Sequence, residues 1–227
     1  MVGVNPAALP DLAGIDAALF DLDGTLVDSE RVHRAAWMSF FDSRGWEVSD
    51  QIYANHFLGR RGADTFRSLD GPWSGHDPDA LLAEVLGHLS DIELTPLPVL
   101  GAAELLRALH SQGIPVAVVT SAVRAWVGSS LAVLGVTDLV TTVVGAEDVR
   151  AGKPNPEGYL EACRRLGVPP ARVAAFEDST SGVSAAVAAG ISPVIGVLTT
   201  TSADALRTAG ATHLIDDFGA MEIVESR

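Results

Sequence analysis

Residues 18–30 read ALFDLDGTLVDSE, and this stretch decides the fold. An apolar run from Ile15 to Phe20, interrupted only by Asp16, is typical of a buried strand and leads into Asp21 and Asp23. Side chains two residues apart in an extended segment point to the same side, so both carboxylates can face one site. Carboxylates this close repel each other unless something compensates. The stretch therefore predicts a functional site, although by itself it also fits an ordinary strand end and turn.

Short apolar runs alternate with helical patterns along most of the chain. The runs typical of buried strands are Ala17–Phe20, Pro115–Thr120, Leu139–Val144, Val173–Phe176 and Pro193–Val197. Apolar residues recur every three or four positions in Ala102–His110, Val123–Leu134, Pro156–Leu166 and Ser181–Ala189. This alternation predicts an α/β fold, a Rossmann-like doubly wound parallel sheet that binds ligands beyond the carboxyl ends of its strands.

The segment from Ser29 to Thr95 interrupts this alternation. It shows no strand pattern, and its apolar residues are spaced as on helix faces. We expect a helical cap domain at residues 29–95, inserted into a core domain made of residues 1–28 and 96–227. The expected linkers are Val27–Asp28 and Glu93–Leu100, although Val99–Leu100–Gly101 leaves the register of the second linker open. Because the insertion follows the first strand, it would emerge at the active edge and act as a lid.

Composition bounds the function further. With 227 residues, 48% of them hydrophobic, the chain can bury a substantial core. The net charge of −14 argues against a nucleic-acid partner, because binding phosphate backbones requires clustered Lys and Arg. No apolar segment approaches the roughly 20 residues that span a bilayer, and no basic signal start is present, so we expect a cytoplasmic protein without a membrane partner. We expect a monomer, in which the single cysteine, Cys163, is a buried apolar residue.

A second acidic pair, Glu177–Asp178, follows another apolar run in VAAFEDSTSG. If this strand lies beside the first one, the carboxylates of both pairs converge. A hard divalent cation such as Mg²⁺ is the usual way to offset their repulsion. The alternative is an exposed turn or a helix start with Asp178 or Ser179 as its N-cap.

Two further motifs offer partners for a phosphate. VAVVTSA ends in Thr120 and Ser121, whose hydroxyls and neighbouring N–H groups suit phosphate oxygens, although they would equally suit N-capping. RAGKPNP contains Lys153, the only lysine beside fourteen arginines. A surface position is the default for a lysine, but this one is a candidate point charge at the site. The motif is not a Walker sequence, because the complete glycine-rich pattern is absent.

With these motifs in order, the sequence resembles the haloacid dehalogenase-like superfamily of phosphotransferases. The similar segments are DLDGT (Asp21–Thr25), VVTSA around Thr120, GKPNP around Lys153 and FEDSTSG around Glu177–Asp178. The resemblance covers the chain from about Ile15, and the helical insertion is similar to the cap of the β-phosphoglucomutase-like branch, which includes sugar and polyol phosphate phosphatases.

The resemblance implies a role for each core residue. Asp21 would attack the phosphorus and form an aspartyl-phosphate. Asp23 would protonate the leaving alcohol and then take a proton from water, helped by a neighbouring carboxylate and a closing lid. The Asp21 side chain, the Asp23 carbonyl, Asp178 and, directly or through water, Glu177 would hold Mg²⁺. The Thr120 hydroxyl, the Ser121 amide and Lys153 would stabilise the transferring oxygens.

The resemblance leaves two activities open. The first is a Mg²⁺-dependent phosphatase that acts on a small phosphorylated metabolite, such as a sugar or polyol phosphate. The alternative is a β-phosphoglucomutase-type phosphotransferase, which His33 favours because mutases carry a His there. Against it, Gly62 stands where the mutase has a phosphate-binding Arg, and residues 29–95 contain no lysine. The candidate substrate-binding residues of the cap are His33, His56, Gly59, Arg60 and Arg61.

Other relatives fit less well. Dehalogenases lack an acid/base Asp at the position of Asp23, and phosphonatases need a cap lysine. A binding protein that has lost catalysis is disfavoured because the expected catalytic side chains are all present.

Overall fold

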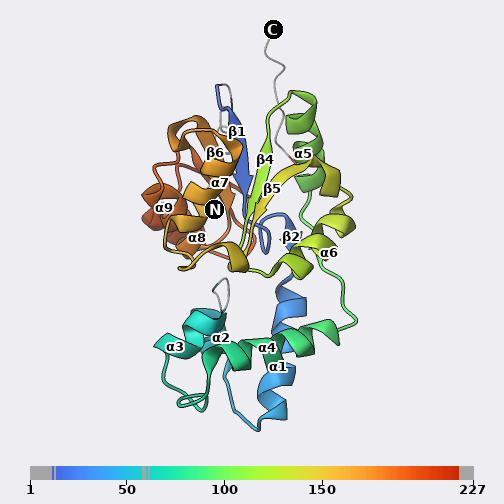
Figure 1. Cartoon of the computed structure of the whole chain (residues 1–227), viewed down its shortest axis with the longest axis vertical. Coiled ribbons are helices and arrows are strands. Elements are labelled where there is room, and N and C mark those ends of the chain that lie inside the picture. Colours follow the sequence, from blue (N-terminus) through green and yellow to red (C-terminus); the bar gives the residue numbers. More distant parts are fainter. Residues whose placement is uncertain (1–11, 13, 58–59, 61, 220–227) are drawn as a thin grey trace, which may run out of the picture.

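The sheet at the centre of the molecule is entirely parallel (Figure 1). The computed structural model describes residues 12, 14–57, 60 and 62–219. The strand order is β5-β4-β1-β6-β7-β8. The strands are β1 (Ala17–Phe20), β4 (Val116–Val119), β5 (Val140–Val144), β6 (Val173–Glu177), β7 (Val194–Val197) and β8 (His213–Ile215). Pairing of β1 with β6, Ala17 opposite Val173, brings the two strands that end in acidic residues side by side.

Helices cover both faces of this sheet. They are α5 (Ala102–Ser111), α6 (Arg124–Leu134), α7 (Glu157–Leu166), α8 (Thr180–Ala188) and α9 (Ala203–Ala209). Ala18 and Phe20 of β1 pack in one core with α5 and α6, whereas Ala17 and Leu19 pack in the other with α7, α8 and α9. Successive residues of a strand point to opposite faces, so a fully apolar strand fits a sheet covered on both sides. The predicted doubly wound α/β fold is confirmed.

Short 3₁₀ helices connect several of these elements: η1 (Thr137–Leu139), η2 (Ala146–Asp148) and η3 (Pro170–Arg172). The five strands and four helices expected for the core are present, and no end is shifted by more than one residue. Helix α9 and strand β8 were not predicted from the sequence. Cys163 is buried in α7 among apolar side chains, as expected.

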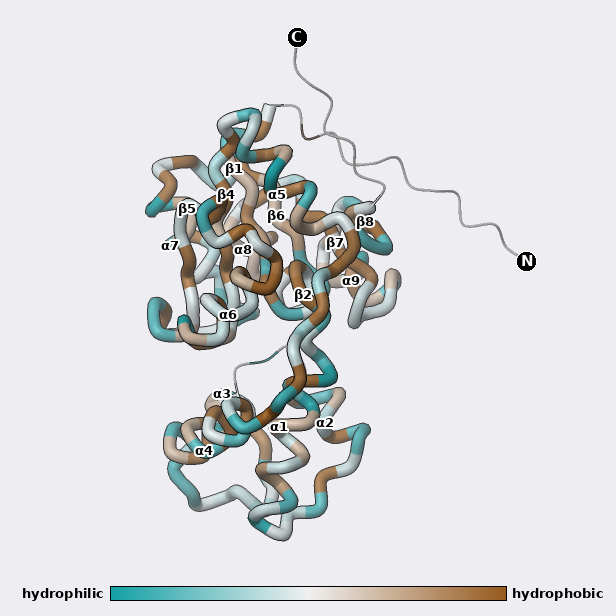
Figure 2. The backbone as a smooth tube through the Cα atoms, turned by 90° about the vertical axis from the view of Figure 1, so that its right-hand side faces the viewer, coloured by the Kyte–Doolittle hydropathy of each residue, from teal (hydrophilic) through white to brown (hydrophobic). Residues whose placement is uncertain are grey.

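The inserted segment is helical and lies beyond one edge of the sheet (Figure 1). Its helices are α1 (Glu30–Ser43), α2 (Asp50–His56), α3 (Gly62–Ser68) and α4 (Pro78–Ser90). They enclose an aromatic core of their own that includes Trp37, Phe40, Phe41, Phe57 and Trp73. In Figure 2, hydrophobic stretches of the chain occur in both the sheet region and the helical region. The boundaries at residues 28/29 and 95/96 stay a prediction.

The two chain crossings between core and insertion are paired with each other. β2 (Val27–Asp28) and β3 (Leu97–Pro98) form a small antiparallel sheet, with Val27 opposite Pro98. The expected linkers thus form a two-stranded ribbon at the base of the insertion. Over the described residues, the helices are all too short or too polar to cross a membrane.

Candidate active site

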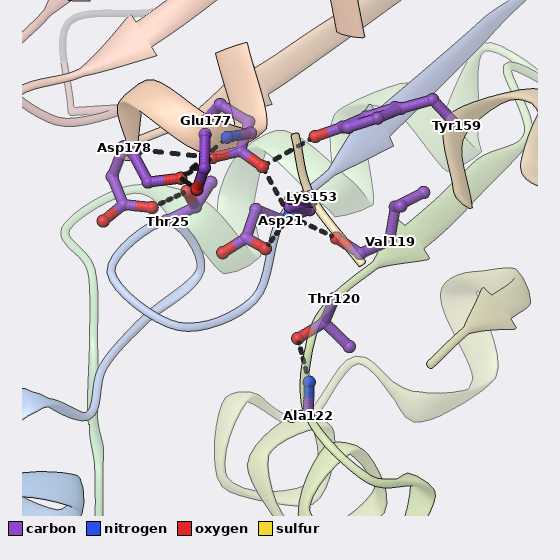
Figure 3. Close-up of polar contacts among 12 residues, drawn as sticks. Asp21, Thr25, Val119, Thr120, Ala122, Lys153, Tyr159, Glu177 and Asp178 are labelled. Atoms are coloured by element: carbon purple, nitrogen blue, oxygen red, sulfur yellow. Dashed lines mark hydrogen bonds and ion pairs between the residues drawn. The ribbon is translucent and has the colours of Figure 1, made fainter. Parts of the chain in front are cut away.

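Three buried carboxylates meet where β1 and β6 end (Figure 3). Asp21 directly follows β1, Glu177 is the last residue of β6, and Asp178 comes next. One oxygen from each carboxylate lies within 4.8 Å of the others. The prediction that the carboxyl ends of neighbouring strands bring these side chains together is confirmed for these three, and the alternative of an exposed turn at Glu177–Asp178 is wrong. Ser179, next in the chain, is the N-cap of α8.

Lys153 is the buried cation among these carboxylates (Figure 3). Its Nζ donates hydrogen bonds to Asp21 Oδ1, to Glu177 Oε1 at 2.5 Å and to the carbonyl oxygen of Val119 at 3.0 Å. Burial by itself would lower the pKa of Lys153, but the charges and hydrogen bonds of Asp21 and Glu177 outweigh it and raise the pKa above its ordinary value. The only lysine of the chain is therefore a charged component of the site, not a surface residue.

The carboxylates nevertheless carry more negative charge than Lys153 can neutralise. Burial, reinforced by the charges of Glu177 and Asp178, raises the pKa of Asp21 well above its usual range, although Lys153 opposes the shift. Burial and the charge of Glu177 raise the pKa of Asp178 to about 7. One ammonium group cannot neutralise three carboxylates, and carboxylate oxygens are the ligands that a hard divalent cation prefers. The site could therefore hold a metal ion.

Hydroxyl groups fix two of these carboxylates in place. Asp178 accepts hydrogen bonds from Thr25 Oγ1 at 3.1 Å and from Thr200 Oγ1. Glu177 accepts from the Tyr159 hydroxyl at 2.8 Å and from Ser179 Oγ at 3.0 Å. Thr200 and Tyr159 were not predicted from the sequence. A signal for the first existed, because Thr200 follows β7 at the same edge of the sheet.

Two glycines make room for the carboxylates. Gly24 has φ +86°, and a Cβ built on it would lie 2.2 Å from Asp178 Oδ2. A Cβ on Gly182, in the first turn of α8, would lie 1.8 Å from Glu177 Oε1. Any side chain at either position would displace an acidic group.

Thr120 and Ser121 line the same cavity as Asp21 and Lys153. Thr120 follows β4, and its Oγ1 accepts a hydrogen bond from the amide of Ala122 at 3.0 Å (Figure 3). Helix α6 begins at Arg124 with Val123 as its N-cap, so neither Thr120 nor Ser121 caps it. The capping alternative for this motif is wrong.

Asp23 also lines the cavity, but it lies outside the acidic cluster. Asp21 and Asp23 thus face one cavity, as the sequence pattern predicted, but they have different partners. Asp23 Oδ1 instead accepts hydrogen bonds from Ser29 Oγ at 2.6 Å, Trp126 Nε1 at 2.8 Å and His33 Nε2 at 3.0 Å.

The surroundings of Asp23 differ from those expected. We expected a neighbouring carboxylate to favour its neutral form. Burial alone would raise the pKa of Asp23, but the charge of His33 and the three hydrogen bonds outweigh burial and lower it. The pKa of His33, which burial would lower, is raised because Asp23 stabilises its cationic form. In this structure His33 is thus a partner of Asp23.

The cavity between the sheet edge and the helical insertion has a volume of about 260 Å³. Of the candidate cap residues, His33 and Arg60 line it, together with Trp37 and Gly62. His56 is absent from the described lining, and its carbonyl oxygen accepts a hydrogen bond from Thr65 Oγ1 at 2.6 Å. Gly59 and Arg61 lie outside the described residues.

A family model, related sequences and a solved structure all indicate the same family for this chain. The family model described as haloacid dehalogenase-like hydrolase matches residues 15–190. Validoxylamine A 7'-phosphate phosphatase from Streptomyces hygroscopicus subsp. limoneus is 39% identical over 85% of this chain and 90% of its own. The β-phosphoglucomutase of Mycobacterium bovis is 31% identical over 91% of each chain. A crystal structure of CbbY from Rhodobacter sphaeroides with xylulose-1,5-bisphosphate superimposes with a TM-score of 0.80, at 27% identity, over 91% of this chain and 96% of that one.

Proposed function

Because the chain belongs to the haloacid dehalogenase-like hydrolase family, we propose that it is a Mg²⁺-dependent phosphatase that hydrolyses sugar or polyol phosphates through an aspartyl-phosphate. The observation that carries the proposal is the position of Asp21. Its carboxylate is hydrogen-bonded to the buried Lys153 and lines the cavity of about 260 Å³ between the sheet edge and the helical insertion. A phosphate ester can enter there and meet a carboxylate, a cation and the Thr120 hydroxyl together.

Asp21 acts as the nucleophile in this proposal. One of its oxygens forms a bond to phosphorus while the bond from phosphorus to the alcohol oxygen breaks. Lys153 neutralises charge on the transferring oxygens, and the Thr120 hydroxyl and Ser121 amide donate hydrogen bonds to them. Water then attacks the same phosphorus, which releases inorganic phosphate and restores Asp21.

Asp23 moves the protons. It gives a proton to the departing alcohol oxygen and afterwards removes one from the attacking water. The three donors on its Oδ1 favour the ionised carboxylate, which is the form that activates water. To act first as an acid, Asp23 must take up a proton when substrate binds, as the approach of the phosphate dianion favours.

The donor set supports Mg²⁺ as the cation. Asp21, Asp178 and the carbonyl oxygen of Asp23 are the proposed ligands. Glu177, which accepts hydrogen bonds from Lys153, Tyr159 and Ser179, would contact the ion directly or through water. Bound there, Mg²⁺ would stabilise negative charge on the phosphoryl group.

The cap favours the phosphatase over the mutase. A Cβ added at Gly62 would lie 2.8 Å from the Trp37 ring, so the space that a mutase would give to an arginine side chain is filled by an indole. The 39% identical relative is named a phosphatase. The mutase remains the second candidate because of His33 and the 31% identical β-phosphoglucomutase. We propose that the enzyme acts as a monomer on a small phosphorylated metabolite, without nucleic acid.

The test is a substrate panel with Mg²⁺ present. It contains hexose, pentose, glycerol and cyclitol phosphates, and, separately, β-glucose 1-phosphate with a catalytic amount of glucose 1,6-bisphosphate. Release of inorganic phosphate supports the phosphatase. Accumulation of glucose 6-phosphate without free phosphate supports the mutase instead, and no reaction with any ester contradicts both.

A further inference from the structure

One oxygen of Asp23 joins the core to the helical insertion. Of its three donors, Ser29 is the N-cap of α1 and His33 lies in the first turns of that helix. The third, Trp126, belongs to α6, which packs on the sheet. None of the four motifs includes Trp126, and it lies 103 positions from Asp23 in the chain.

Trp126 lies at the boundary between the cavity and the apolar core of the sheet. Its side chain is half-buried and lines the cavity, and its ring packs on His33 with the centroids 4.8 Å apart and the planes at 57°. The indole N–H can only donate a hydrogen bond. Its bond of 2.8 Å to Asp23 Oδ1 therefore requires that oxygen to be an acceptor.

This requirement determines which oxygen of Asp23 can carry a proton. Oδ1 accepts from the donor-only indole and also from Ser29 and His33, so it has no room for a proton of its own. Oδ2 has no hydrogen-bond partner among the described residues. A proton on Asp23 therefore resides on Oδ2.

We propose that Trp126 is a positioning residue for proton transfer: its indole N–H anchors Asp23 Oδ1, so that Oδ2 faces the leaving alcohol and then the water. The inference rests on the proposed function, since it assumes that Asp23 exchanges protons with the substrate. The proposal thus adds a residue that lies outside the family motifs, on helix α6 at the wall of the cavity.

The kinetic test compares leaving groups. Trp126→Phe keeps the ring and removes the donor. With an alkyl phosphate, whose alcohol must be protonated as it leaves, kcat/KM should fall by about 10-fold or more, because a misplaced acid loses part of the 10²- to 10⁴-fold that general acid catalysis supplies. With p-nitrophenyl phosphate, whose phenolate leaves unprotonated, kcat/KM should change less than about 3-fold, because kcat/KM reports the steps up to release of the phenolate and these need no acid. The later attack of water uses Asp23 with both substrates, so a fall in kcat alone does not distinguish them.

Matched variants separate positioning from simple packing. Trp37→Phe alters another cavity-lining indole that has no bond to Asp23 among the described contacts, and it should affect both substrates alike. Asp23→Ala should show the same asymmetry as Trp126→Phe but more strongly, and the double variant should lose no more than Asp23→Ala alone. Equal losses of kcat/KM on both substrates in Trp126→Phe would overturn the proposal.

A readout without turnover keeps this proposal separate from the proposed function. The chain has four tryptophans, and the indole ¹H–¹⁵N resonance missing from Trp126→Phe identifies Trp126. That resonance should move upfield in Asp23→Ala, while those of Trp46 and Trp73 in the insertion stay in place. If no ester is hydrolysed, the proposed function fails although the resonance shifts; an unshifted Trp126 resonance overturns the positioning contact itself.

Discussion

Lys153 and Asp21, 132 residues apart in sequence, form a buried ion pair at the carboxyl edge of the sheet. The same ammonium group also bonds to Glu177. A cation shared by two buried carboxylates compensates part of their desolvation, and removing it leaves both without their positive partner. The pair therefore serves stability and chemistry together.

Replacing Lys153 tests both consequences. Lys153→Met should lower the free energy of unfolding by about 3 to 5 kcal/mol in the presence of a chelator, because two buried carboxylates lose their cation. It should also abolish phosphatase activity. Urea denaturation and a phosphate-release assay measure these effects, with Arg150→Met, an exposed position in the same loop, as the control. Unchanged stability in Lys153→Met would show that the ion pair contributes nothing.

Two helical glycines form a matched pair for testing the fit around Glu177. Gly182→Ala places a methyl group 1.8 Å from Glu177 Oε1, whereas nothing lies within 4 Å of a Cβ at Gly128 in α6. We expect Gly128→Ala to raise the free energy of unfolding by about 0.5–1 kcal/mol. Gly182→Ala should lower it and reduce activity, because Glu177 must move. Thermal unfolding and phosphate release measure both; similar results for the two variants would contradict the close packing at Gly182.

Asp178 should make the metal-free protein less stable as the pH rises. Its pKa is about 7 in the folded state against 3.8 for an ordinary Asp, so between these values the folded state binds more protons than the unfolded state. The free energy of unfolding contributed by this group therefore falls from about pH 4 to pH 7. The measurement is urea unfolding with chelator across this range, for the wild type and Asp178→Asn. The stability of the wild type relative to the variant should decline with pH, and a constant or rising difference would contradict the prediction.

The sequence predicted Lys153 from its motif and the site residues at the ends of β1, β4 and β6, but it missed Thr200 after β7 and the aromatic residues that reach the site from helices. Asp21, Thr120, Glu177 and Asp178 follow or end buried apolar strands, and parallel pairing brings such ends to one edge. Trp126 and Tyr159 lie on helices, where an aromatic residue resembles any other apolar position until the tertiary contact is known.

The partners of Asp23 show a second limit of sequence patterns. Alternation placed Asp23 on the same side as Asp21, and both line the cavity, but the pattern could not show that Asp23 bonds to Ser29, His33 and Trp126. Helix α9 and strand β8 were missed because they are short and partly exposed, which leaves little apolar periodicity.

The central claim is that Asp21 becomes phosphorylated during turnover. The most direct measurement is to mix enzyme and p-nitrophenyl phosphate with Mg²⁺, quench within the first turnover, reduce with borohydride and locate the modified residue by mass spectrometry. We predict homoserine at position 21, an unmodified Asp23, and neither turnover nor modification in a folded Asp21→Asn variant. Hydrolysis by Asp21→Asn, or wild-type turnover that leaves Asp21 unmodified, would contradict the account.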